Sequence, residues 1–422
     1  MKIKKIFARE IFDSFGLPTI ECEIMLSSGE TATTAISHHG AHNSKNQTGL
    51  YDLERFDGAG VQNAVNLINK TFAPLLCDRE PHLLDLDQLL QDTTQTRIKE
   101  NLGSNTMRAL STAICKAQAL SEGISVYETI GHMYDIQSVS IPLCMLTIFE
   151  GHNSHSSFPF KSISIIPHGT VTFKDAFEIG AKIFQAIGKR LTNKSSAKCI
   201  GINGGYAPHN TDIAELFKLL LEEIELLELT TQVVIGLEIG DALLYNNEKR
   251  IYQINDTIFT SEDIIGNYAS MIEEFGLYTL EDGLGNQDWE GWNTMMETLG
   301  DSVQVIGNEL FLSKYNRIIE GIENALMHGI AVVPADTATV TEILQASKLA
   351  DMYETETMVT HAAQETVDDF IADFAVGTNA TYLKAGGLLR SEFLAKYHRL
   401  IKIEEELIAL ADPEQEMDFQ DF

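Results

Sequence analysis

Residues 277–283 read LYTLEDG and decide the fold, because an apolar run ends there in two carboxylates and a glycine. Two runs of the same kind are VVIGLE at 233–238 and VQVIGNE at 303–309. Apolar, β-rich runs with glycine at their ends are typical of buried parallel strands. Polar residues at the C-terminal ends of such strands are where α/β barrels place their chemistry. The three runs therefore predict strands whose polar ends converge on one cavity.

The polar ends of these runs are Glu238, Glu281 and Asn308, and their oxygen atoms suit a divalent cation such as Mg²⁺. Asn308 is an amide where a metal site would favour another carboxylate. Glu309 follows it, and a regular strand would point that side chain to the opposite face. The sequence thus indicates a metal site with one damaged ligand.

Composition limits the class of protein. The 422-residue chain is 44% hydrophobic and 22% charged, which is ordinary for a globular protein and long enough for two domains. Its formal net charge of −31 would repel a polyphosphate backbone. Nucleic acid is therefore not expected as a partner.

Cysteine use and the distribution of apolar residues bear on location. The five cysteines are scattered without CxxC spacing, which argues against a disulfide framework and against a zinc ribbon. No apolar segment follows the N-terminal lysines, so no signal peptide is expected. No apolar stretch approaches the roughly 20 residues that span a bilayer. We expect a cytoplasmic protein that does not contact membranes.

Residues 1–136 are predicted to form an α+β domain. Strand-type runs come first, with Ser27-Ser28-Gly29-Glu30 as a hairpin turn, and helix-period runs follow, the last closed by Gly123. The expected strands are 3–10, 18–26 and 31–36, and the expected helices lie near 60–76, 84–92 and 104–121.

Residues 137–422 are predicted to form an α/β domain in which strands and helices alternate. This alternation favours a (β/α)₈ TIM-type barrel, with a doubly wound sheet as the weaker alternative. The expected strands are 162–166, 197–201, 232–238, 277–281, 303–307, 330–334, 356–361 and 382–386. The expected helices lie near 173–190, 212–228, 262–275, 290–299, 315–327, 340–351, 367–375 and 390–410. The acidic tail with Phe419 and Phe422 is expected to fray, or else to bind a partner.

A series of short motifs runs along the whole chain in a fixed order. They are AREIFDSFGLPT at 8–19, LGSN at 102–105, GGYAP at 204–208, LEDGL at 280–284 with DW at 288–289, IAD at 371–373, VGT at 376–378, LKAG at 383–386 and AKY at 395–397. In this order and spacing the chain resembles the enolase (phosphopyruvate hydratase) family from end to end. The resemblance implies an α+β domain followed by a barrel, and a lyase that uses two Mg²⁺ ions, a lysine base and a glutamate acid.

The residues that the resemblance assigns to proton transfer are replaced here. Val333 stands at the position of the lysine base, and an alkyl side chain takes no proton. Asn203 and Ser162 stand where the family has glutamates. A general base contributes roughly 10²–10⁴-fold to a rate, so these replacements predict lost or severely impaired dehydration of 2-phosphoglycerate.

Phosphate and metal binding are also changed relative to the family pattern. His361 is kept, but Ala362 replaces an arginine whose planar fork would hold phosphate, and Ala363 replaces a serine. The metal-ligand positions hold Glu238, Glu281 and Asn308, with one negative charge fewer than the family set. Mg²⁺ is expected from the family, but its binding is predicted to be weak or absent.

Lys384 is kept at a position where the family lysine contacts the carboxylate of the substrate. Two interpretations stay open for it. Lys384 either retains that contact, or it forms an ion pair with Glu281 that fills the space of a former metal site.

Histidines gather in segments that correspond to the mouth of the family's active site: His38, His39, His42, His152, His155 and His361. Imidazoles could bind Zn²⁺ or another transition metal, or supply a base near neutral pH. The alternative is that these are solvated loop histidines.

We interpret the chain as an enolase-fold pseudoenzyme that binds a small molecule in the barrel mouth or a protein partner. One alternative is an active, divergent magnesium-dependent enolase of glycolysis, in which Lys314 or Lys348 would have to serve as base. The other is a metal-dependent lyase or isomerase with histidine-based chemistry. A homodimer is expected from the resemblance, although Phe15 replaces an arginine in a motif that looks like part of the dimer contact.

Overall fold

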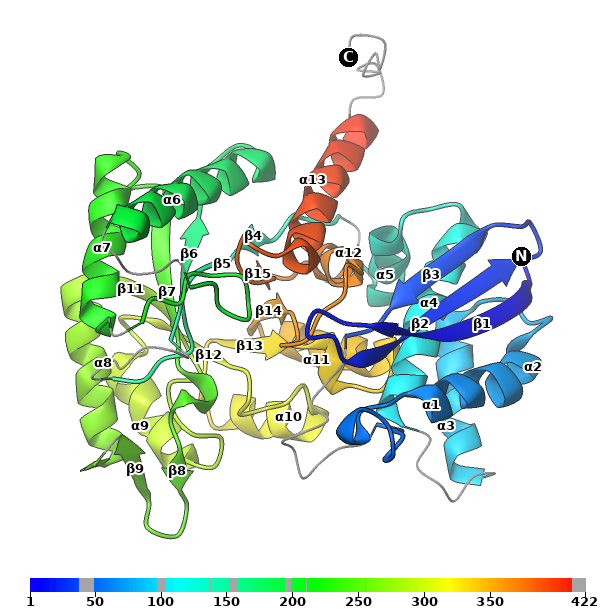
Figure 1. Cartoon of the computed structure of the whole chain (residues 1–422), viewed down its shortest axis with the longest axis horizontal. Helices are drawn as coiled ribbons and strands as arrows, with labels where there is room; N and C mark the ends of the chain where they lie inside the picture. The colour runs from blue at the N-terminus through cyan, green and yellow to red at the C-terminus, as the bar shows by residue number, and fades with distance from the viewer. Residues whose placement is uncertain are drawn as a thin grey trace.

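The computed structural model places an N-terminal α+β part beside a barrel, as Figure 1 shows with the first in blue to cyan and the second in green to red. It describes residues 1–37, 49–96, 103–136, 138–151, 158–193, 199–209, 211–254 and 256–411. The expected α/β architecture, a barrel preceded by an α+β unit, is confirmed.

The N-terminal part begins with an antiparallel sheet whose strands pair in the order β1-β2-β3. The predicted turn at residues 27–30 closes the β2–β3 hairpin, since Leu26 N donates to Glu30 O at 2.9 Å. Gly123 ends α4 with a φ of 72°, a left-handed conformation that glycine adopts without a Cβ clash. The strands are β1 (Ile3–Phe12), β2 (Pro18–Leu26) and β3 (Thr31–Ala35), and the helices are α1 (Gln62–Leu67), α2 (Ala73–Leu76), α3 (Leu83–Thr96), α4 (Ser104–Glu122) and α5 (Val126–Tyr134).

The barrel sheet has the strand order β4-β15-β14-β13-β12-β11-β7-β6-β5. Only Met145 separates β4 from β5, and its amide donates to Leu383 O at 2.9 Å, so this interrupted strand pairs with β15 on one side and with β6 on the other. The strands are β4 (Leu143–Cys144), β5 (Leu146–Glu150), β6 (Ser162–Pro167), β7 (Val233–Glu238), β11 (Leu277–Glu281), β12 (Gln304–Gly307), β13 (Gly329–Val332), β14 (Glu356–Thr360) and β15 (Tyr382–Lys384).

Strand β6 runs antiparallel to both of its neighbours, β5 and β7, whereas the other barrel pairs are parallel. Residues 151–161 are too few for the dozen or more residues that a parallel crossover needs. The antiparallel pairing places Ser162, the first residue of β6, opposite Glu238, the last residue of β7.

The helices lie outside the barrel sheet (Figure 1). They are α6 (Phe173–Asn193), α7 (Ile213–Leu226), α8 (Ser261–Phe275), α9 (Trp289–Leu299), α10 (Tyr315–Glu323), α11 (Val340–Met352), α12 (Phe370–Gly377) and α13 (Ser391–Ala411). A small sheet of β8 (Tyr245–Asn246), β9 (Ile251–Ile254) and β10 (Thr257–Phe259) precedes α8. Of the described helices, none is long and apolar enough to cross a bilayer.

One predicted barrel strand is wrong. In the described part of the run at 197–201, Ile200 forms only an isolated bridge with Tyr206. The barrel uses β5 in its place, because the run LTIFE is buried along its whole length and pairs with β6. Helix α5 was not predicted either; its Ser125 and Glu128 form a capping box.

A largely buried ion pair joins the two parts of the molecule. Lys116 on α4 places its Nζ 2.9 Å from Asp368 Oδ2, which precedes α12. The same carboxylate accepts hydrogen bonds from Thr34 Oγ1 at 2.7 Å and from Ala35 N at 2.9 Å, both on β3. Asp368 therefore contacts both β3 and α4 of the N-terminal part, and these contacts hold the barrel against that part.

We predict that Lys116→Met lowers the free energy of unfolding by about 3 kcal/mol, because it leaves the buried Asp368 carboxylate without its cation. Urea denaturation followed by circular dichroism measures the change. The matched control is Lys182→Met, which removes an exposed i,i+4 pair with Glu178 and is expected to change stability by about 0.5 kcal/mol or less. Equal effects of the two substitutions would contradict the role of the junction pair.

Candidate functional site

The C-terminal ends of three barrel strands bring opposite charges together. Glu238 ends β7, Glu281 ends β11 and Lys384 ends β15, and all three side chains are buried. Lys384 Nζ lies 2.9 Å from Glu238 Oε2 and also forms an ion pair with Glu281 Oε2. The predicted Lys384–Glu281 ion pair is therefore present, and the ammonium group lies between the two carboxylates.

Three more polar side chains bind the oxygens of the two carboxylates. Ser162 Oγ donates to Glu238 Oε2 at 2.7 Å, and Lys161 Nζ lies 3.0 Å from Glu238 Oε1. Asn308 Nδ2 donates to Glu281 Oε1 at 3.0 Å. The Asn308 amide thus presents its donor end to the cluster, so it acts as a hydrogen-bond donor to Glu281 where a metal ligand would have to offer oxygen.

The expected direction of Glu309 is wrong. Strand β12 ends at Gly307, and the backbone amides of Asn308 and Glu309 both donate to the Asp282 carboxylate, at 2.8 and 2.9 Å. Because the chain turns there, the alternation of a regular strand no longer applies. Glu309 Oε1 lies 3.8 Å from Lys161 Nζ, on the same side as the cluster.

The charges in the cluster shift one another's protonation. Burial acts to raise the pKa of Glu238, but Lys161 and Lys384 outweigh it and hold that pKa well below its usual range. Burial, reinforced by the charge of Glu238, raises the pKa of Glu281. Burial also raises the pKa of Asp282 to about 8, with Glu309 and Glu281 adding to it. The lysines therefore stabilise the charge of Glu238 above all.

The residues present do not fit a Mg²⁺ ion. Mg²⁺ needs near-octahedral oxygen ligation at about 2.0–2.1 Å, and the oxygens of Glu238 and Glu281 are already bound to two ammonium groups, a hydroxyl and an amide N–H. Within the described ranges, no group of three or more His, Cys, Asp or Glu side chains could hold a metal ion.

The position of the family's lysine base lies in an apolar environment. Val333 is buried with Ala335 and Ala362 in a small apolar cluster beyond the ends of β13 and β14. Its backbone amide donates to Ser313 Oγ at 3.0 Å. Asp336 follows three residues later: its backbone N–H donates to Val333 O at 2.9 Å, and burial raises the pKa of its carboxyl to about 6. Val333 itself offers no group that could take up a proton.

Asn203 is buried at the position where the family has a proton-donating glutamate. Its backbone N–H donates to the Glu150 carboxylate at 3.0 and 3.1 Å, and the backbone N–H of Gly205 donates to the same group at 2.8 Å. Burial raises the pKa of Glu150. The Asn203 Oδ1 atom is buried without a hydrogen-bond partner in the described part of the chain.

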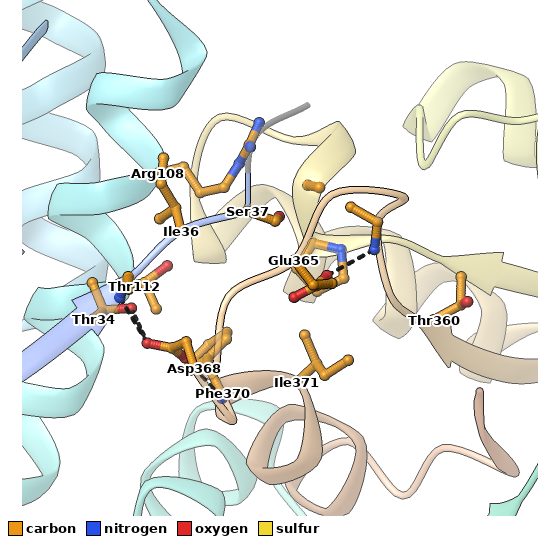
Figure 2. Close-up of a pocket in the computed structure, with 14 residues that line it drawn as sticks. Thr34, Ile36, Ser37, Arg108, Thr112, Thr360, Glu365, Asp368, Phe370 and Ile371 are labelled. Carbon is orange, nitrogen blue, oxygen red and sulfur yellow. Dashed lines mark hydrogen bonds between the residues drawn. The ribbon is translucent and has the colours of Figure 1, made fainter. Parts of the chain in front are cut away.

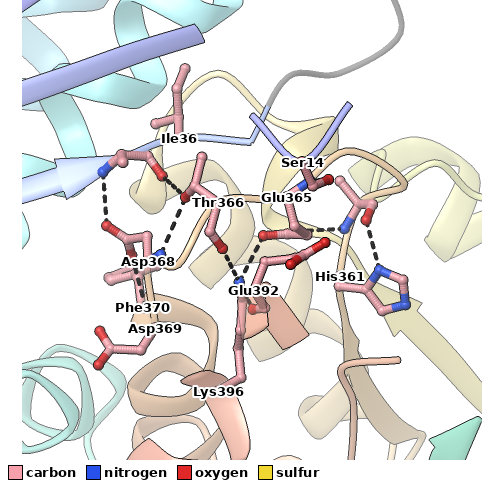
Figure 3. A network of polar contacts seen from close by, with 12 residues as sticks. Ser14, Ile36, His361, Glu365, Thr366, Asp368, Asp369, Phe370, Glu392 and Lys396 are labelled. Atoms are coloured by element: carbon pink, nitrogen blue, oxygen red, sulfur yellow. Dashed lines mark hydrogen bonds and ion pairs between the residues drawn. The ribbon is translucent and has the colours of Figure 1, made fainter. Parts of the chain in front are cut away.

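His361 follows β14 and is held by its own loop. Its Nδ1 atom lies 2.6 Å from the carbonyl oxygen of Ala362 (Figure 3). Its ring packs against Phe393 with centroids 4.8 Å apart. Burial lowers the pKa of His361 to about 3, so the ring is neutral at pH 7. The other histidines of the proposed metal set, His38, His39, His42, His152 and His155, lie outside the described residues.

Sequence reasoning missed three charged residues near the site: Lys161, Asp282 and Arg108. Lys161 precedes β6, and only the antiparallel β6–β7 pairing brings it to Glu238. Asp282 has a φ of 48°, which is unusual for a residue other than glycine. The Gly283 that follows it in the LEDG motif indicates a turn but does not identify Asp282 as the residue with this conformation. Arg108 lies on α4 and is buried at the junction with the barrel.

Fold and site together define a barrel protein whose charged residues meet at the C-terminal ends of the strands, the usual place for an enolase-type lyase site. Two family models match the chain: "Enolase, N-terminal domain" over residues 3–130 and "Enolase, C-terminal TIM barrel domain" over residues 138–416. The chain belongs to the enolase family.

We predict that His361 makes the protein less stable in acid. Its pKa is about 3 in the folded protein and about 6.5 in an unfolded chain, so the unfolded state binds the proton first as the pH falls. Its contribution is complete above about pH 6.5 and is lost progressively below it. The urea midpoint of His361→Gln should therefore fall less between pH 6.5 and 4.5 than that of the wild type.

The control for this experiment is His82→Gln, which removes a side chain that is 54% exposed. It is expected to follow the wild-type curve between pH 6.5 and 4.5. If His361→Gln follows that curve as well, the neutral, buried state of His361 is refuted.

Proposed function

We propose that this enolase-family protein is a pseudoenzyme that does not dehydrate 2-phosphoglycerate at an enzymatic rate. One observation carries the proposal: the Lys384 ammonium group lies between Glu238 and Glu281, 2.9 Å from the first and ion-paired with the second. A cation supplied by the chain thus balances the carboxylates that a metal would bind. Displacing it would leave Lys384, which is 4% exposed, buried and unpaired.

The environment of the base position supports the same proposal. Val333 packs with Ala335 and Ala362, and its alkyl side chain takes no proton. Of the two lysines considered as substitutes, Lys314 follows Ser313, whose hydroxyl accepts a hydrogen bond from Val333 N. Lys348 Nζ donates to Met133 O at 3.0 Å and lies over the Tyr134 ring, which ties it to α5. Lys314 is exposed at the start of α10. Neither arrangement favours an active, divergent enolase of glycolysis.

We propose binding as the remaining role, with a small molecule or a protein partner as the ligand. The five loop histidines that a histidine-based lyase or isomerase would use lie outside the described residues. We propose a cytoplasmic location because the five cysteines are free.

We predict no phosphoenolpyruvate formation above background in a coupled assay with 2-phosphoglycerate and Mg²⁺. Loss of the base alone should lower the rate by about 10²–10⁴-fold relative to an active enolase assayed in parallel. Turnover within about tenfold of that enzyme would overturn the proposal.

Isothermal titration with Mg²⁺ and Mn²⁺ tests separately whether Lys384 occupies the place of a metal ion. The wild type is expected to give no saturable binding, whereas Lys384→Met should gain it because Glu238 and Glu281 lose their shared cation. Lys348→Met is the matched control, since it removes a lysine that contacts α5 and should behave as the wild type. Tight metal binding by the wild type would show that Lys384 does not replace a metal.

We also propose a homodimer that uses the exposed aromatic residues of the N-terminal part. Phe12 is 58% exposed, Phe15 41% and Phe56 44%, and the rings of Phe12 and Phe56 meet edge to face with centroids 5.8 Å apart. Single exposed apolar residues are normal, but a group of exposed aromatic side chains marks an interaction surface. We propose that a second copy of the chain covers it, as the family resemblance also suggests.

Sedimentation velocity at micromolar concentration is expected to show a dimer, and Phe15→Ser should shift the distribution toward monomer by weakening the aromatic contact. Val171→Ser is the control, because Val171 is 98% exposed on the barrel part and lies outside this cluster. A monomeric wild type would refute the dimer.

A further inference from the structure

A polar pocket lies where the β8–β9 turn, the segment that joins β11 to α9, and helix α10 meet at one side of the barrel (Figure 1). Its volume is about 350 Å³, and small-molecule sites usually have volumes of roughly 300–1,000 Å³. We call it the Trp289 pocket. Its lining residues are Asn247, Asn286, Gln287, Trp289, Arg317 and Glu320.

The Trp289 pocket is separate from the site at the ends of the barrel strands. The cavity that Figure 2 shows is lined by the end of β3, by α4 and by the segments that follow β13 and β14, and it belongs to the mouth of the barrel. Among the described residues, the Trp289 pocket shares no lining residue with that cavity and contains no member of the Lys384 cluster. A ligand of this pocket therefore does not depend on the chemistry of the strand ends.

Hydrogen bonds hold the walls of the pocket in place. Tyr252 Oη on β9 donates to Asp288 Oδ2 at 2.7 Å, which ties the small sheet to the start of α9. Arg317 Nη2 on α10 donates to the carbonyl oxygen of Asn286 at 3.0 Å, which ties α10 to the segment before α9. Because the walls are already ordered, a ligand loses little binding free energy to ordering them.

Trp289 supplies the aromatic surface of the pocket. It is the first residue of α9, and its side chain packs in part against the main core and in part lines the pocket. The guanidinium carbon of Arg317 lies 5.8 Å from the centroid of the indole ring, a cation–π contact. The ring is thus held in place, and it offers a flat apolar surface beside polar groups.

The polar side chains of the pocket have hydrogen-bonding capacity left. Within the described ranges, the side-chain amides of Asn247, Asn286 and Gln287 form no hydrogen bond. The Glu320 carboxylate forms no hydrogen bond or ion pair with another described residue, and Arg317 Nε is buried without a partner there. Amides donate and accept, a carboxylate accepts and a guanidinium donates. The pocket therefore suits a ligand that carries both donors and acceptors.

The charges of the pocket favour a neutral ligand. Arg317 and Glu320 line it together and carry opposite charges one turn apart on α10. The formal net charge of −31 on the whole chain opposes the approach of an anion. A wholly apolar ligand is also disfavoured, because it would remove the free amides from water without giving them hydrogen bonds.

We propose that the Trp289 pocket binds one unit of a neutral saccharide, with the sugar ring against Trp289 and the hydroxyls on Asn247, Asn286 and Glu320. The C–H groups of a sugar ring form an apolar face for the indole, and each hydroxyl both donates and accepts. A volume of about 350 Å³ holds about a dozen water molecules, and a hexose has about as many non-hydrogen atoms. This site goes beyond the proposed function, because it is separate from the barrel mouth.

Titration of the full chain with D-glucose, D-galactose, D-mannose, N-acetyl-D-glucosamine and maltose tests the proposal. Isothermal titration should show saturable binding of at least one of these sugars at one site per chain, with a millimolar or lower dissociation constant. Tryptophan emission should change with the same midpoint. The chain has two tryptophans, and Trp292 is fully buried, so the change reports Trp289.

Three further probes define the chemistry that the pocket recognises. Glycerol, an acyclic polyol, is expected not to bind saturably, because it has no ring to pack against the indole. D-Glucose 6-phosphate and D-glucosamine carry opposite charges. Both are expected to bind no more tightly than the best neutral sugar, since the pocket contains one charge of each sign.

Variants localise the binding. Trp289→Leu keeps an apolar side chain but removes the aromatic surface, so it should weaken binding about tenfold or more. Glu320→Ala and Asn247→Ala each remove one hydrogen-bonding group from an exposed position and should weaken binding by a few-fold. The matched controls are Glu323→Ala on α10 and Asn293→Ala on α9. Both residues are exposed and do not line the pocket, so these variants should bind as the wild type.

Three outcomes would overturn the proposal: no saturable binding of any neutral sugar, binding of the charged probes alone, or binding of glycerol equal to that of the sugars. Unchanged affinity in both Glu320→Ala and Asn247→Ala would place the sugar elsewhere. These two variants decide even if Trp289→Leu does not fold, because both positions are exposed. No turnover is measured, so the outcome is independent of the pseudoenzyme proposal.

Discussion

The charge balance at the C-terminal ends of β7, β11 and β15 constrains the rest of the site. Two carboxylates that face each other across adjacent strands repel unless a cation lies between them. Lys384 is that cation, and Ser162, Asn308 and Lys161 complete the hydrogen bonds of the carboxylates. A buried ion pair of this kind does not add much stability by itself, but removing one member leaves a charge uncompensated. The replacements at the site are therefore mutually dependent.

The same device recurs elsewhere. Lys116 pairs with Asp368 at the junction of the two parts, and Lys396 pairs with Glu365 and Arg399 with Asp373 within the barrel part; the acid of each pair is largely buried. The chain has 30 lysines and arginines against 61 aspartates and glutamates, so cations are scarce. Placing several of them inside leaves the surface acidic while the buried carboxylates stay neutralised. The excess negative charge is thus a property of the surface.

Most of the fold could be predicted from local patterns, since apolar runs such as VVIGLE and LYTLE became β7 and β11 with only small shifts of their ends. The β5 run was missed because LTIFE lies close to another strand and has no turn signal that separates it from β4. The site was predictable where strand ends carry the charge, as for Glu238 and Glu281. Lys161 and Arg108 could not be predicted in this way. The antiparallel β6–β7 pairing brings Lys161 to the site, and the contact between the two parts brings Arg108 there. Neither kind of contact produces a recognisable pattern in the local sequence.

The motifs that identify the family are largely structural, and this explains how the fold persists without the catalytic residues. Gly204 and Gly386 have φ angles of 79° and 82°, and a Cβ atom on Gly387 would lie 2.5 Å from Gly204 O, so the GGYAP and KAG segments need glycine for close backbone approach. Asp288 accepts hydrogen bonds from Tyr252 Oη at 2.7 Å and from Gly291 N at 3.1 Å, which caps α9. Selection for folding alone would keep these residues. A family match carried by them therefore establishes the scaffold, whereas activity has to be judged at Val333, Asn203 and Lys384.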